Sequence, residues 1–235
     1  MPTAVVTGGT RGLGRTMVEH LVSEGWRVVF DARRNPDVER MLAEIDARAP
    51  ASTVVGISGD VTDALHRSEL ARATGDGGLD LLVNNAGALG PTPLPRLVDV
   101  APSDLSDLFD TNVIAPIRLV SEMLTSLQRC AGIVVNISSD AAVEAYEGWG
   151  AYGASKAALD HVSKVLADEH PDLSVYAFDP GDMRTNMYQS AFPGEDISDR
   201  PLPESVVPLL MRLVKQRPPS GRYTRADMTM QPAPR

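Results

Sequence analysis

Short apolar runs rich in β-branched residues alternate along this chain with segments of helical periodicity. Most of the runs are apolar at consecutive positions rather than at every second position, which is typical of strands that are covered on both faces. The runs predict strands at Thr3–Thr7, Arg27–Ala32, Thr53–Ile57, Leu79–Asn84, Ile133–Ser138, Ser174–Phe178 and, weakly, Arg222–Ala226.

Apolar residues at helical spacing fill the segments between these runs. Helices are predicted over Leu13–Val22, Val38–Ala47, Ser103–Leu127, Tyr152–Asp168 and Glu204–Lys215. Strands that alternate with helices predict an α/β fold, in which a doubly wound parallel sheet of about seven strands carries helices on both faces. No linker or repeat divides the chain, so residues 1–235 are expected to form a single domain. Residues 187–203 are expected to form a substrate loop, and the tail after Met228 is expected to fray.

Composition and charge favour a small-molecule ligand over a macromolecular partner. The net charge of −9 and the pI near 4.9 argue against a nucleic-acid binder, which needs a basic patch. The single cysteine, Cys130, excludes an intrachain disulfide and fits a reducing compartment, and the histidines show no metal-ligand spacing. The first apolar run begins too early to leave room for a signal peptide, and no run approaches the ~18 residues of a membrane span. We therefore expect a cytoplasmic protein that binds neither a metal nor a membrane.

The segment after the first predicted strand, "TGGTRGLG", is rich in glycine. Ligands of parallel α/β sheets bind at the carboxyl ends of the strands, so this turn lies where a ligand is expected. Gly8, Gly12 and Gly14 permit a tight turn and a close approach of the backbone to a pyrophosphate at the N-terminus of the next helix. The spacing G-x-x-x-G-x-G differs from the usual dinucleotide fingerprint, and such turns also arise for purely geometric reasons.

The second predicted strand ends in "FDARRN", where a protein that binds unphosphorylated NAD usually offers a carboxylate to the ribose. Counting about 20 residues from Gly12 leads to Ala32, which is followed by Arg33. An arginine can fork onto a 2′-phosphate, and Arg11 in the glycine-rich turn can approach the same group, so the sequence favours NADP(H) over NAD(H). In the alternative interpretation, the arginines merely start a solvated helix and Asp31 is the ribose ligand.

Three other strand ends carry polar motifs: "DVT" (Asp60–Thr62), "NNAG" (Asn84–Gly87) and "NISS" (Asn136–Ser139). Each motif alone is compatible with an ordinary turn or helix cap, because Asn, Asp, Ser and Gly are favoured in both. In "YGASK", Tyr152 and Lys156 are four residues apart and therefore one turn apart on the same face of a predicted helix. Such a pair is commonplace on exposed helices, so the joint occurrence of the motifs carries the information.

Taken together, the motifs resemble those of the short-chain dehydrogenase/reductase family in its compact form. The resemblance covers Thr3–Thr185: "TGGTRGLG" is similar to the family's cofactor loop, "NNAG" to its central-sheet motif and "YGASK" to its Tyr-x-x-x-Lys pair. "FDTNV" carries the family's asparagine as Asn112, Ser139 lies thirteen residues before the tyrosine, and "DPGDMRT" resembles the family's proline-glycine turn. The resemblance implies a Rossmann fold and an enzyme that interconverts C=O and CH–OH groups with a nicotinamide cofactor.

The resemblance also implies roles for four catalytic residues. Tyr152 exchanges a proton with the substrate oxygen, and Ser139 hydrogen-bonds that oxygen. Lys156 binds the nicotinamide ribose, and Asn112 holds a water that passes protons to Lys156. A free tyrosine has a pKa of about 10, so bringing it near 7 requires about 4 kcal/mol of stabilisation of the phenolate, which we expect the charge of Lys156 to supply in part. The residues expected to contact the cofactor are Gly8, Thr10, Arg11, Gly12, Leu13, Gly14, Arg33, Asp60, Val61, Asn85, Gly87, Tyr152, Lys156, Pro180 and Thr185.

Asp182 and Arg184 depart from the family pattern, in which apolar residues are frequent at these positions, and they favour a polar substrate. Other side chains that flank the expected site either line a pocket for an apolar or ring-bearing substrate or serve as ordinary packing. They are Tyr146, Trp149, Met187 and Tyr188. The last strand lacks the apolar, glycine-ended close of many tetrameric members, whereas a homodimer through helices 103–127 and 152–168 is compatible with the sequence.

Two alternatives come from other functional classes. A catalytically idle cofactor sensor would keep the fold and bind NADP to signal redox state, but it has no need of the four catalytic residues. A sugar-nucleotide epimerase or dehydratase shares the Tyr-x-x-x-Lys pair, but it generally needs a larger substrate domain and a different glycine spacing. The sequence therefore favours an NADP(H)-preferring oxidoreductase that acts on a small-molecule ketone, aldehyde or alcohol, with Tyr152 as the general acid/base.

Overall fold

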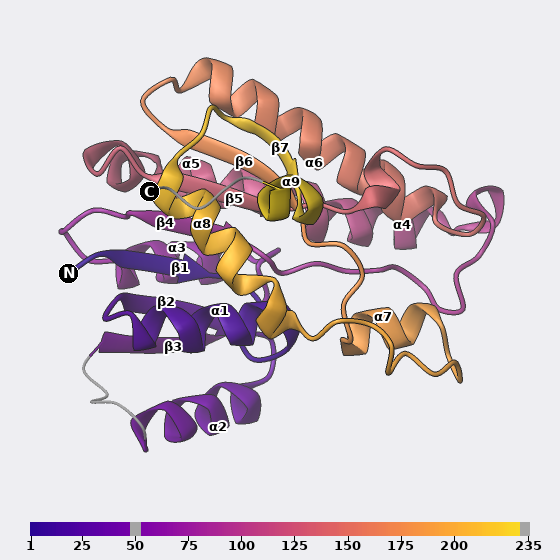
Figure 1. Cartoon of the computed structure of the whole chain (residues 1–235), viewed down its shortest axis with the longest axis horizontal. Helices are drawn as coiled ribbons and strands as arrows, with labels where there is room; N and C mark the ends of the chain where they lie inside the picture. The colour runs from indigo at the N-terminus through magenta and orange to yellow at the C-terminus, as the bar shows by residue number, and fades with distance from the viewer. Residues whose placement is uncertain (48–52, 231–235) are drawn as a thin grey trace.

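Parallel strands form one central sheet, and helices cover both of its faces in the computed structural model (Figure 1). The structure describes residues 1–47 and 53–230. The strands lie in the order β3-β2-β1-β4-β5-β6-β7, so the direction of winding reverses between β3 and β4. This arrangement confirms the predicted doubly wound sheet. The strands are β1 (Thr3–Val6), β2 (Arg27–Ala32), β3 (Val54–Ser58), β4 (Leu81–Asn84), β5 (Ile133–Ile137), β6 (Ser174–Asp179) and β7 (Gly221–Thr224).

Consecutive residues of each strand face opposite layers of helices. In β2, Val28 and Phe30 belong to one buried hydrophobic cluster, whereas Val29 belongs to the other. The helices of the first cluster are α1 (Gly12–Ser23), α2 (Asn35–Asp46) and α8 (Val207–Gln216). The helices of the second cluster are α3 (Ala64–Ala73), α5 (Ala115–Arg129) and α6 (Gly150–Glu169). Burial on both faces explains why the strands are apolar at consecutive positions.

The long helix predicted over 103–127 forms, and it contains a π-helical turn. It consists of α4 (Pro102–Phe109), the π-helical turn (Asp110–Ile114) and α5. Pro116 has no amide hydrogen, so it cannot donate to the carbonyl group of Asn112 four residues earlier. A π-helical turn accommodates this gap, and Asn112 is buried within it. The predicted helix is therefore confirmed, but the apolar pattern did not indicate the π-helical turn that carries Asn112.

The last strand ends two residues earlier than predicted. β7 pairs with β6 up to Thr224, and α9 (Arg225–Met230) begins at the next residue. Asp227 Oδ2 accepts hydrogen bonds from the amide and the hydroxyl of Thr224, each at 2.8 Å, and the Asp227 amide donates to Thr224 Oγ1 at 3.2 Å. This reciprocal capping starts a helix and stops the strand. The tail expected to fray after Met228 begins inside α9, and residues 231–235 lie outside the described part of the chain.

Two helices, α3 and α7 (Asn186–Ala191), lack a clear apolar stripe and are not predicted from the sequence. α3 buries His66 and Arg67 while it exposes Leu65, so its apolar and polar residues do not separate by face. α7 occupies the start of the predicted loop 187–203 and stands beyond the carboxyl ends of the strands (Figure 1). Across the described residues, none of the helices is both long enough and apolar enough to cross a bilayer.

Candidate active site

The glycine-rich turn after β1 adopts a conformation that its glycines make possible. Gly8 and Gly12 have φ angles of 66° and 52°, a region that L side chains rarely adopt. A Cβ atom on Gly14 would lie 2.4 Å from the carbonyl oxygen of Gly8, so the turn is too tight for a side chain at that position. The turn therefore brings the start of α1 close to the end of β1.

Neutral donors from the neighbouring strands fix this turn. Asn85 Nδ2 donates to the carbonyl oxygens of Thr7 at 2.8 Å and of Gly8 at 3.3 Å. Thr7 Oγ1 accepts hydrogen bonds from the amides of Asn85 and Ala86. The Gly8 amide donates to Asp31 Oδ1 at 2.6 Å. Asn85, the second asparagine of the "NNAG" motif, thus connects the end of β4 to the glycine-rich turn.

Asp31 at the end of β2 is buried, and both of its oxygens are engaged. Oδ1 accepts from Gly8, and Oδ2 lies 2.9 Å from His66 Nε2 on α3. Strand alternation directs Asp31 to the α3 face of the sheet and Ala32 to the opposite face. This geometry gives no support to the alternative in which Asp31 binds a ribose.

Residues expected around the adenosine half of a cofactor lie beyond β2 and β3. Arg33 is exposed just after β2, and Arg11 is exposed at the N-cap of α1. Burial raises the pKa of Asp60, but hydrogen bonds from Thr62 and the charge of Arg33 outweigh burial, so the pKa lies below its ordinary value. Arg33 and Asp60 therefore interact electrostatically between the ends of β2 and β3. Val61, the residue after Asp60, is buried.

The N-terminus of α1 offers a place for an anion. Among the described residues, no side chain caps its first turn, because Arg11 at the N-cap makes no capping bond. Backbone amides at a helix start, together with the helix dipole, attract phosphate. Thr10 and Leu13 are buried below the turn, and a Cβ atom on Gly12 would lie 3.4 Å from Thr185 Cγ2. These residues fit a dinucleotide with its pyrophosphate at this helix end.

Polar side chains connect the ends of β4 and β5 to α6. Asn84 Nδ2 donates to Asn136 Oδ1 at 2.7 Å, and Asn136 Nδ2 donates to Ser163 Oγ at 2.8 Å. All three residues are buried. Asn84 Oδ1 is buried without a hydrogen-bond partner among the described residues. The two bonds between the side chains connect α6 to the strand ends and so help to set the position of the side chains that α6 carries toward the sheet.

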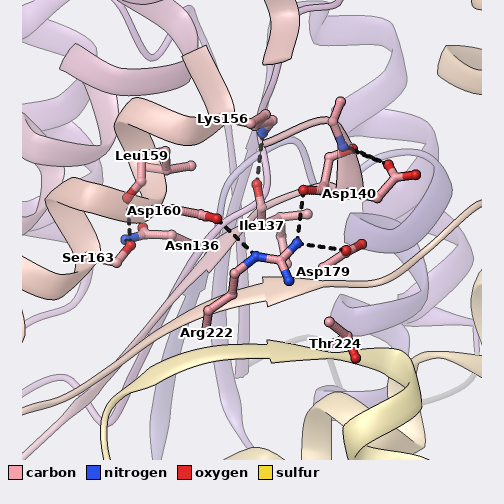
Figure 2. A network of polar contacts seen from close by, with 12 residues as sticks. Asn136, Ile137, Asp140, Lys156, Leu159, Asp160, Ser163, Asp179, Arg222 and Thr224 are labelled. Atoms are coloured by element: carbon pink, nitrogen blue, oxygen red, sulfur yellow. Dashed lines mark hydrogen bonds and ion pairs between the residues drawn. The ribbon is translucent and has the colours of Figure 1, made fainter. Parts of the chain in front are cut away.

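Tyr152 and Lys156 lie one turn apart on α6, as predicted, and both are buried. Their exposed fractions are 8% and 5%. Lys156 Nζ lies 5.6 Å from the centre of the Tyr152 ring and donates to the carbonyl oxygen of Ile137 at 2.7 Å. Figure 2 shows the Lys156 ammonium group directed at the end of β5. The pair thus presents its polar atoms to the strand end in a dry environment.

Burial disfavours the charged form of both groups. It raises the pKa of Tyr152 above its ordinary value, a hydrogen bond with Ser139 lowers it, and the negative charge of Asp179 raises it further. Burial lowers the pKa of Lys156 to about 8 against the opposing charge of Asp160. The expectation that Lys156 brings the phenol pKa down is not met in this structure, because desolvation of the phenolate dominates.

Ser139 lies at the end of β5 in contact with the Tyr152 side chain. Its hydroxyl donates to Asp140 Oδ1 at 2.9 Å and accepts from the Ala141 amide at 3.2 Å. The second bond caps the short 3₁₀ turn that follows the strand. The residue is therefore both a cap, as its residue type alone suggests, and a neighbour of the predicted acid/base.

Asn112 is held in the π-helical turn by three bonds. Its Oδ1 accepts from the Ala88 amide at 2.8 Å, and its Nδ2 donates to the Ala88 carbonyl oxygen and to Ser155 Oγ, each at 2.9 Å. A Cβ atom on Gly87 would lie 3.5 Å from Asn112 Oδ1 and 3.7 Å from Lys156 Nζ. The structure thus brings Asn112 and Lys156 to the same glycine of the "NNAG" motif.

Aromatic rings connect α6 with α7. The ring of Trp149 lies 5.6 Å from that of Tyr152 and 6.0 Å from that of Phe192, and Phe192 lies 4.8 Å from Tyr188. We call Tyr188, Phe192, Trp149 and Tyr152 the aromatic row. Phe192 is not among the predicted flanking residues.

The other flanking residues and the proline-glycine segment differ in exposure. Tyr146 and Met187 are exposed, whereas Pro180 is buried after β6. Thr185 caps α7 by accepting from the Tyr188 amide at 3.2 Å. The cap places Thr185 between α7 and the glycine-rich turn.

The two unusual charges of the proline-glycine segment hold the following loop in place. Asp182 Oδ2 accepts from the Tyr188 hydroxyl at 3.2 Å and lies 3.9 Å from Arg200 Nε. The Arg184 side chain donates to the carbonyl oxygen of Ser198. Both residues remain exposed, so their charges tie the loop to α7 and still face the solvent around the site.

A buried ionic network beside the site has no counterpart among the predicted residues. Arg222 of β7 lies between Asp160 of α6 and Asp179 of β6 (Figure 2). The sequence contained a signal, because Asp160 follows Lys156 by one helical turn and the other two are charged residues within strands. Among the described residues, no three His, Cys, Asp or Glu side chains gather as metal ligands would.

Comparisons with known proteins show what this chain is similar to. Residues 2–196 match the family model described as short chain dehydrogenase. Serine 3-dehydrogenase of Agrobacterium fabrum is 36% identical over 184 residues, which are 76% of this chain and 71% of that protein. Sepiapterin reductase of Bos taurus is 34% identical over 200 residues, which are 80% of this chain and 74% of that protein. A solved short chain dehydrogenase from Escherichia coli CFT073, complexed with NADPH, is 28% identical with a TM-score of 0.88 over 95% of this chain and 96% of that one.

Proposed function

The chain belongs to the short-chain dehydrogenase/reductase family, and from this premise we propose that it is an NADP(H)-preferring oxidoreductase that interconverts a ketone or aldehyde with an alcohol. The observation that carries the proposal is the gathering of Tyr152, Lys156 and Ser139 at the end of β5, with Asn112 at the neighbouring strand end. A nicotinamide cofactor supplies or accepts the hydride when it is bound.

Tyr152 is the proposed general acid/base. Burial keeps the phenol protonated, which is the state required to protonate the oxygen of a carbonyl that is being reduced. In the opposite direction the phenolate removes the proton of the alcohol. Ser139, which contacts Tyr152, is proposed to exchange its hydrogen bond to Asp140 for one to the same oxygen, so that its hydroxyl hydrogen polarises the substrate.

Lys156 and Asn112 are proposed to return the proton to Tyr152. Burial brings the pKa of Lys156 to about 8, so the ammonium group can exchange a proton near neutral pH. Both side chains lie near Gly87, and in this proposal a water carries the proton between this segment and Lys156. In this proposal Lys156 also binds the nicotinamide ribose, while Pro180 and Thr185 border the nicotinamide.

The preference for NADP(H) is proposed from the end of β2. Asp31 is occupied by Gly8 and His66, whereas Arg33 is exposed with its charge near Asp60. A guanidinium group in this position suits a 2′-phosphate. The NADPH complex of the similar Escherichia coli protein is consistent with this assignment.

Thermal unfolding with NADPH, NADP, NADH and NAD in parallel tests this preference. We expect the phosphorylated cofactors to give the larger shifts, and Arg33→Ser to weaken NADPH binding about tenfold while NADH binding is unchanged, since a charge-assisted bond is lost. Arg40→Ser is the matched control, because Arg40 is an exposed arginine paired with Asp37 on α2. Equal shifts for NADH and NADPH in the parent protein would contradict the preference.

We propose that the substrate bears a ring and a polar group. The aromatic row reaches the Tyr152 ring, and Asp182 and Arg184 place charge beside it. Isatin, benzaldehyde, sepiapterin and acetone with NADPH, and L-serine with NADP, form a suitable panel, followed by the absorbance of NADPH. Turnover of acetone above the ring-bearing carbonyls would refute this substrate class, and cofactor binding without turnover of any probe would favour the idle sensor.

We also propose that the protein forms a homodimer in the cytoplasm. Ala154 and Ala157 leave small, exposed positions on α6, the helix that carries Tyr152. Small residues permit close approach of a second helix. Analytical ultracentrifugation should show a dimer that Ala157→Glu dissociates, and a monomeric parent protein would rule this assembly out.

A further inference from the structure

The geometry points to Arg222 of β7 as a positioning residue that holds the main chain of Ser139 so that its hydroxyl faces the reacting oxygen. Arg222 makes no described contact with Tyr152, and its bond to the site is the one to the carbonyl oxygen of Ser139. Its two carboxylate partners also act on the charges of Tyr152 and Lys156, so the test below separates the route through Ser139 from this electrostatic route. The inference rests on the proposed function, because it requires that Ser139 hydrogen-bonds the substrate oxygen.

The guanidinium group of Arg222 joins three elements. Nε donates to Asp160 Oδ2 on α6 at 3.0 Å, and Nη2 donates to Asp179 Oδ2 on β6 at 2.9 Å. Nη2 also donates to the carbonyl oxygen of Ser139 at 3.0 Å. Figure 2 shows the side chain extended from β7 with its two carboxylate partners on either side. A rigid planar fork can serve acceptors in several directions at once.

A small residue on β6 gives Arg222 access to β5. In the register of the sheet, Arg222 lies beside Ala177, and Ala177 lies beside Asn136. Paired residues of parallel strands point to the same face, so the side chain of Arg222 passes over the methyl group of Ala177 toward the end of β5. A larger side chain at position 177 would occupy this path.

The last residue of β5 and the two residues that follow it are each held by a hydrogen bond. Ser139 has an extended backbone, with φ −158° and ψ 159°, so the directions of its peptide groups set the direction of its Cβ atom. Three hydrogen bonds hold this segment: Lys156 Nζ to the carbonyl oxygen of Ile137 at 2.7 Å, the Ser138 amide to the carbonyl oxygen of Phe178 at 2.8 Å, and Arg222 Nη2 to the carbonyl oxygen of Ser139 at 3.0 Å. Two of the three donors, Lys156 and Arg222, are buried or half-buried cations.

The charges explain why the guanidinium group stays in this position. Asp160 and Asp179 are 7% and 6% exposed, and a buried carboxylate needs a partner of opposite charge. Arg222 is the cation that bonds to both. Its two ion pairs therefore anchor the fork, and the remaining bond to Ser139 is aimed by this anchoring.

A double-mutant cycle tests the inference with isatin and NADPH. We expect Ser139→Ala and Arg222→Met each to lower kcat by about tenfold or more, and Arg222→Met to change kcat less than about twofold when Ser139 is already alanine. Arg27→Met is the matched control, because Arg27 also lies on a strand and donates to a main-chain carbonyl oxygen, that of Thr74 at 2.9 Å. It should leave kcat unchanged.

Arg222→Lys tests whether the loss of activity in Arg222→Met comes from a failure to fold. A lysine keeps a positive charge beside the two buried carboxylates, so the chain folds, but one ammonium group cannot bond to three acceptors on three elements. We expect kcat to fall as it does in Arg222→Met. In the protein alone, the carbonyl ¹³C resonance of Ser139 should move in both variants and stay in place in Arg27→Met.

The outcomes separate the inference from the proposed function. If Ser139→Ala has full kcat, the proposed role of Ser139 fails. If Ser139→Ala loses activity but the loss from Arg222→Met multiplies with it, Arg222 acts elsewhere and the positioning role is overturned. Full kcat in Arg222→Lys, or an unmoved Ser139 resonance in both variants, overturns it as well.

Discussion

The ends of β1 and β5 are both fixed by side chains from neighbouring elements, but the kinds of bond differ. Amide groups and Asn85 hold the turn after β1, with Asp31 as an acceptor, whereas the cations Lys156 and Arg222 hold the end of β5. Neutral donors leave the positive end of the α1 dipole for an anionic ligand. Buried cations concentrate charge where a substrate oxygen is proposed to react. Neutral amide donors thus hold one strand end at this edge of the sheet, and cations hold another.

The largest effect on activity is expected at the end of β5, where the cations lie, from Tyr152→Phe. Loss of the proton donor should lower kcat by about 10²- to 10⁴-fold while the thermal shift with NADPH is kept, because the glycine-rich turn is untouched. Tyr146→Phe is the matched control, since Tyr146 is an exposed tyrosine bonded to Asp140 at 3.0 Å. Steady-state kinetics decide the point, and undiminished turnover in Tyr152→Phe would remove the proposed mechanism.

Lys156→Met probes the buried charge through the pH dependence of stability. Because burial lowers the pKa of Lys156 from 10.5 to about 8, the unfolded chain binds more protons than the folded chain between these values, and the stability contribution rises with pH across that window. The full change is about 3 kcal/mol. Urea unfolding of both proteins across the window should show the parent gaining this amount relative to Lys156→Met. A constant difference would mean that the ammonium group is not desolvated.

The smallest effect is expected at the turn after β1, which neutral donors hold, from Asp31→Asn. An asparagine can still accept from Gly8 but loses the charge, so we expect a loss of about 1–2 kcal/mol in the free energy of unfolding and a weaker thermal shift with NADPH. Asp76→Asn, at an exposed position, is the control. Urea unfolding measures the effect, and a stability equal to that of the control would show that the carboxylate charge does not contribute to the turn.

Most of the fold follows from local patterns. Consecutive apolar residues predicted β1 to β6, whereas β7 has no apolar run and was predicted only weakly. Apolar stripes predicted α1, α2, α6 and α8, because burial on defined faces leaves a periodic trace. α3 left no such trace, since it buries His66 for a bond to Asp31. The π-helical turn depends on one missing amide hydrogen at Pro116, which a search for helical stripes does not register.

The residues of the candidate site also differ in whether local spacing or long-range packing places them. Tyr152 and Lys156 are one turn apart by sequence spacing alone, and their joint burial follows from the face of α6 on which they lie. Arg222 and Ser139 are 83 residues apart, and their contact depends on the register of β5, β6 and β7. The direction of the Tyr152 pKa shift depends on desolvation, which spacing does not reveal. Contacts that arise only from strand register therefore escape prediction from a single sequence.

The late position of β7 has a consequence for biosynthesis. Every residue that fixes the glycine-rich turn belongs to the first 86 positions of the chain, whereas the end of β5 waits for Arg222. Domains begin to fold from the N-terminus while the ribosome is still working. A nascent chain that ends before Arg222 therefore contains every residue that bonds the glycine-rich turn and still lacks the donor to the carbonyl oxygen of Ser139.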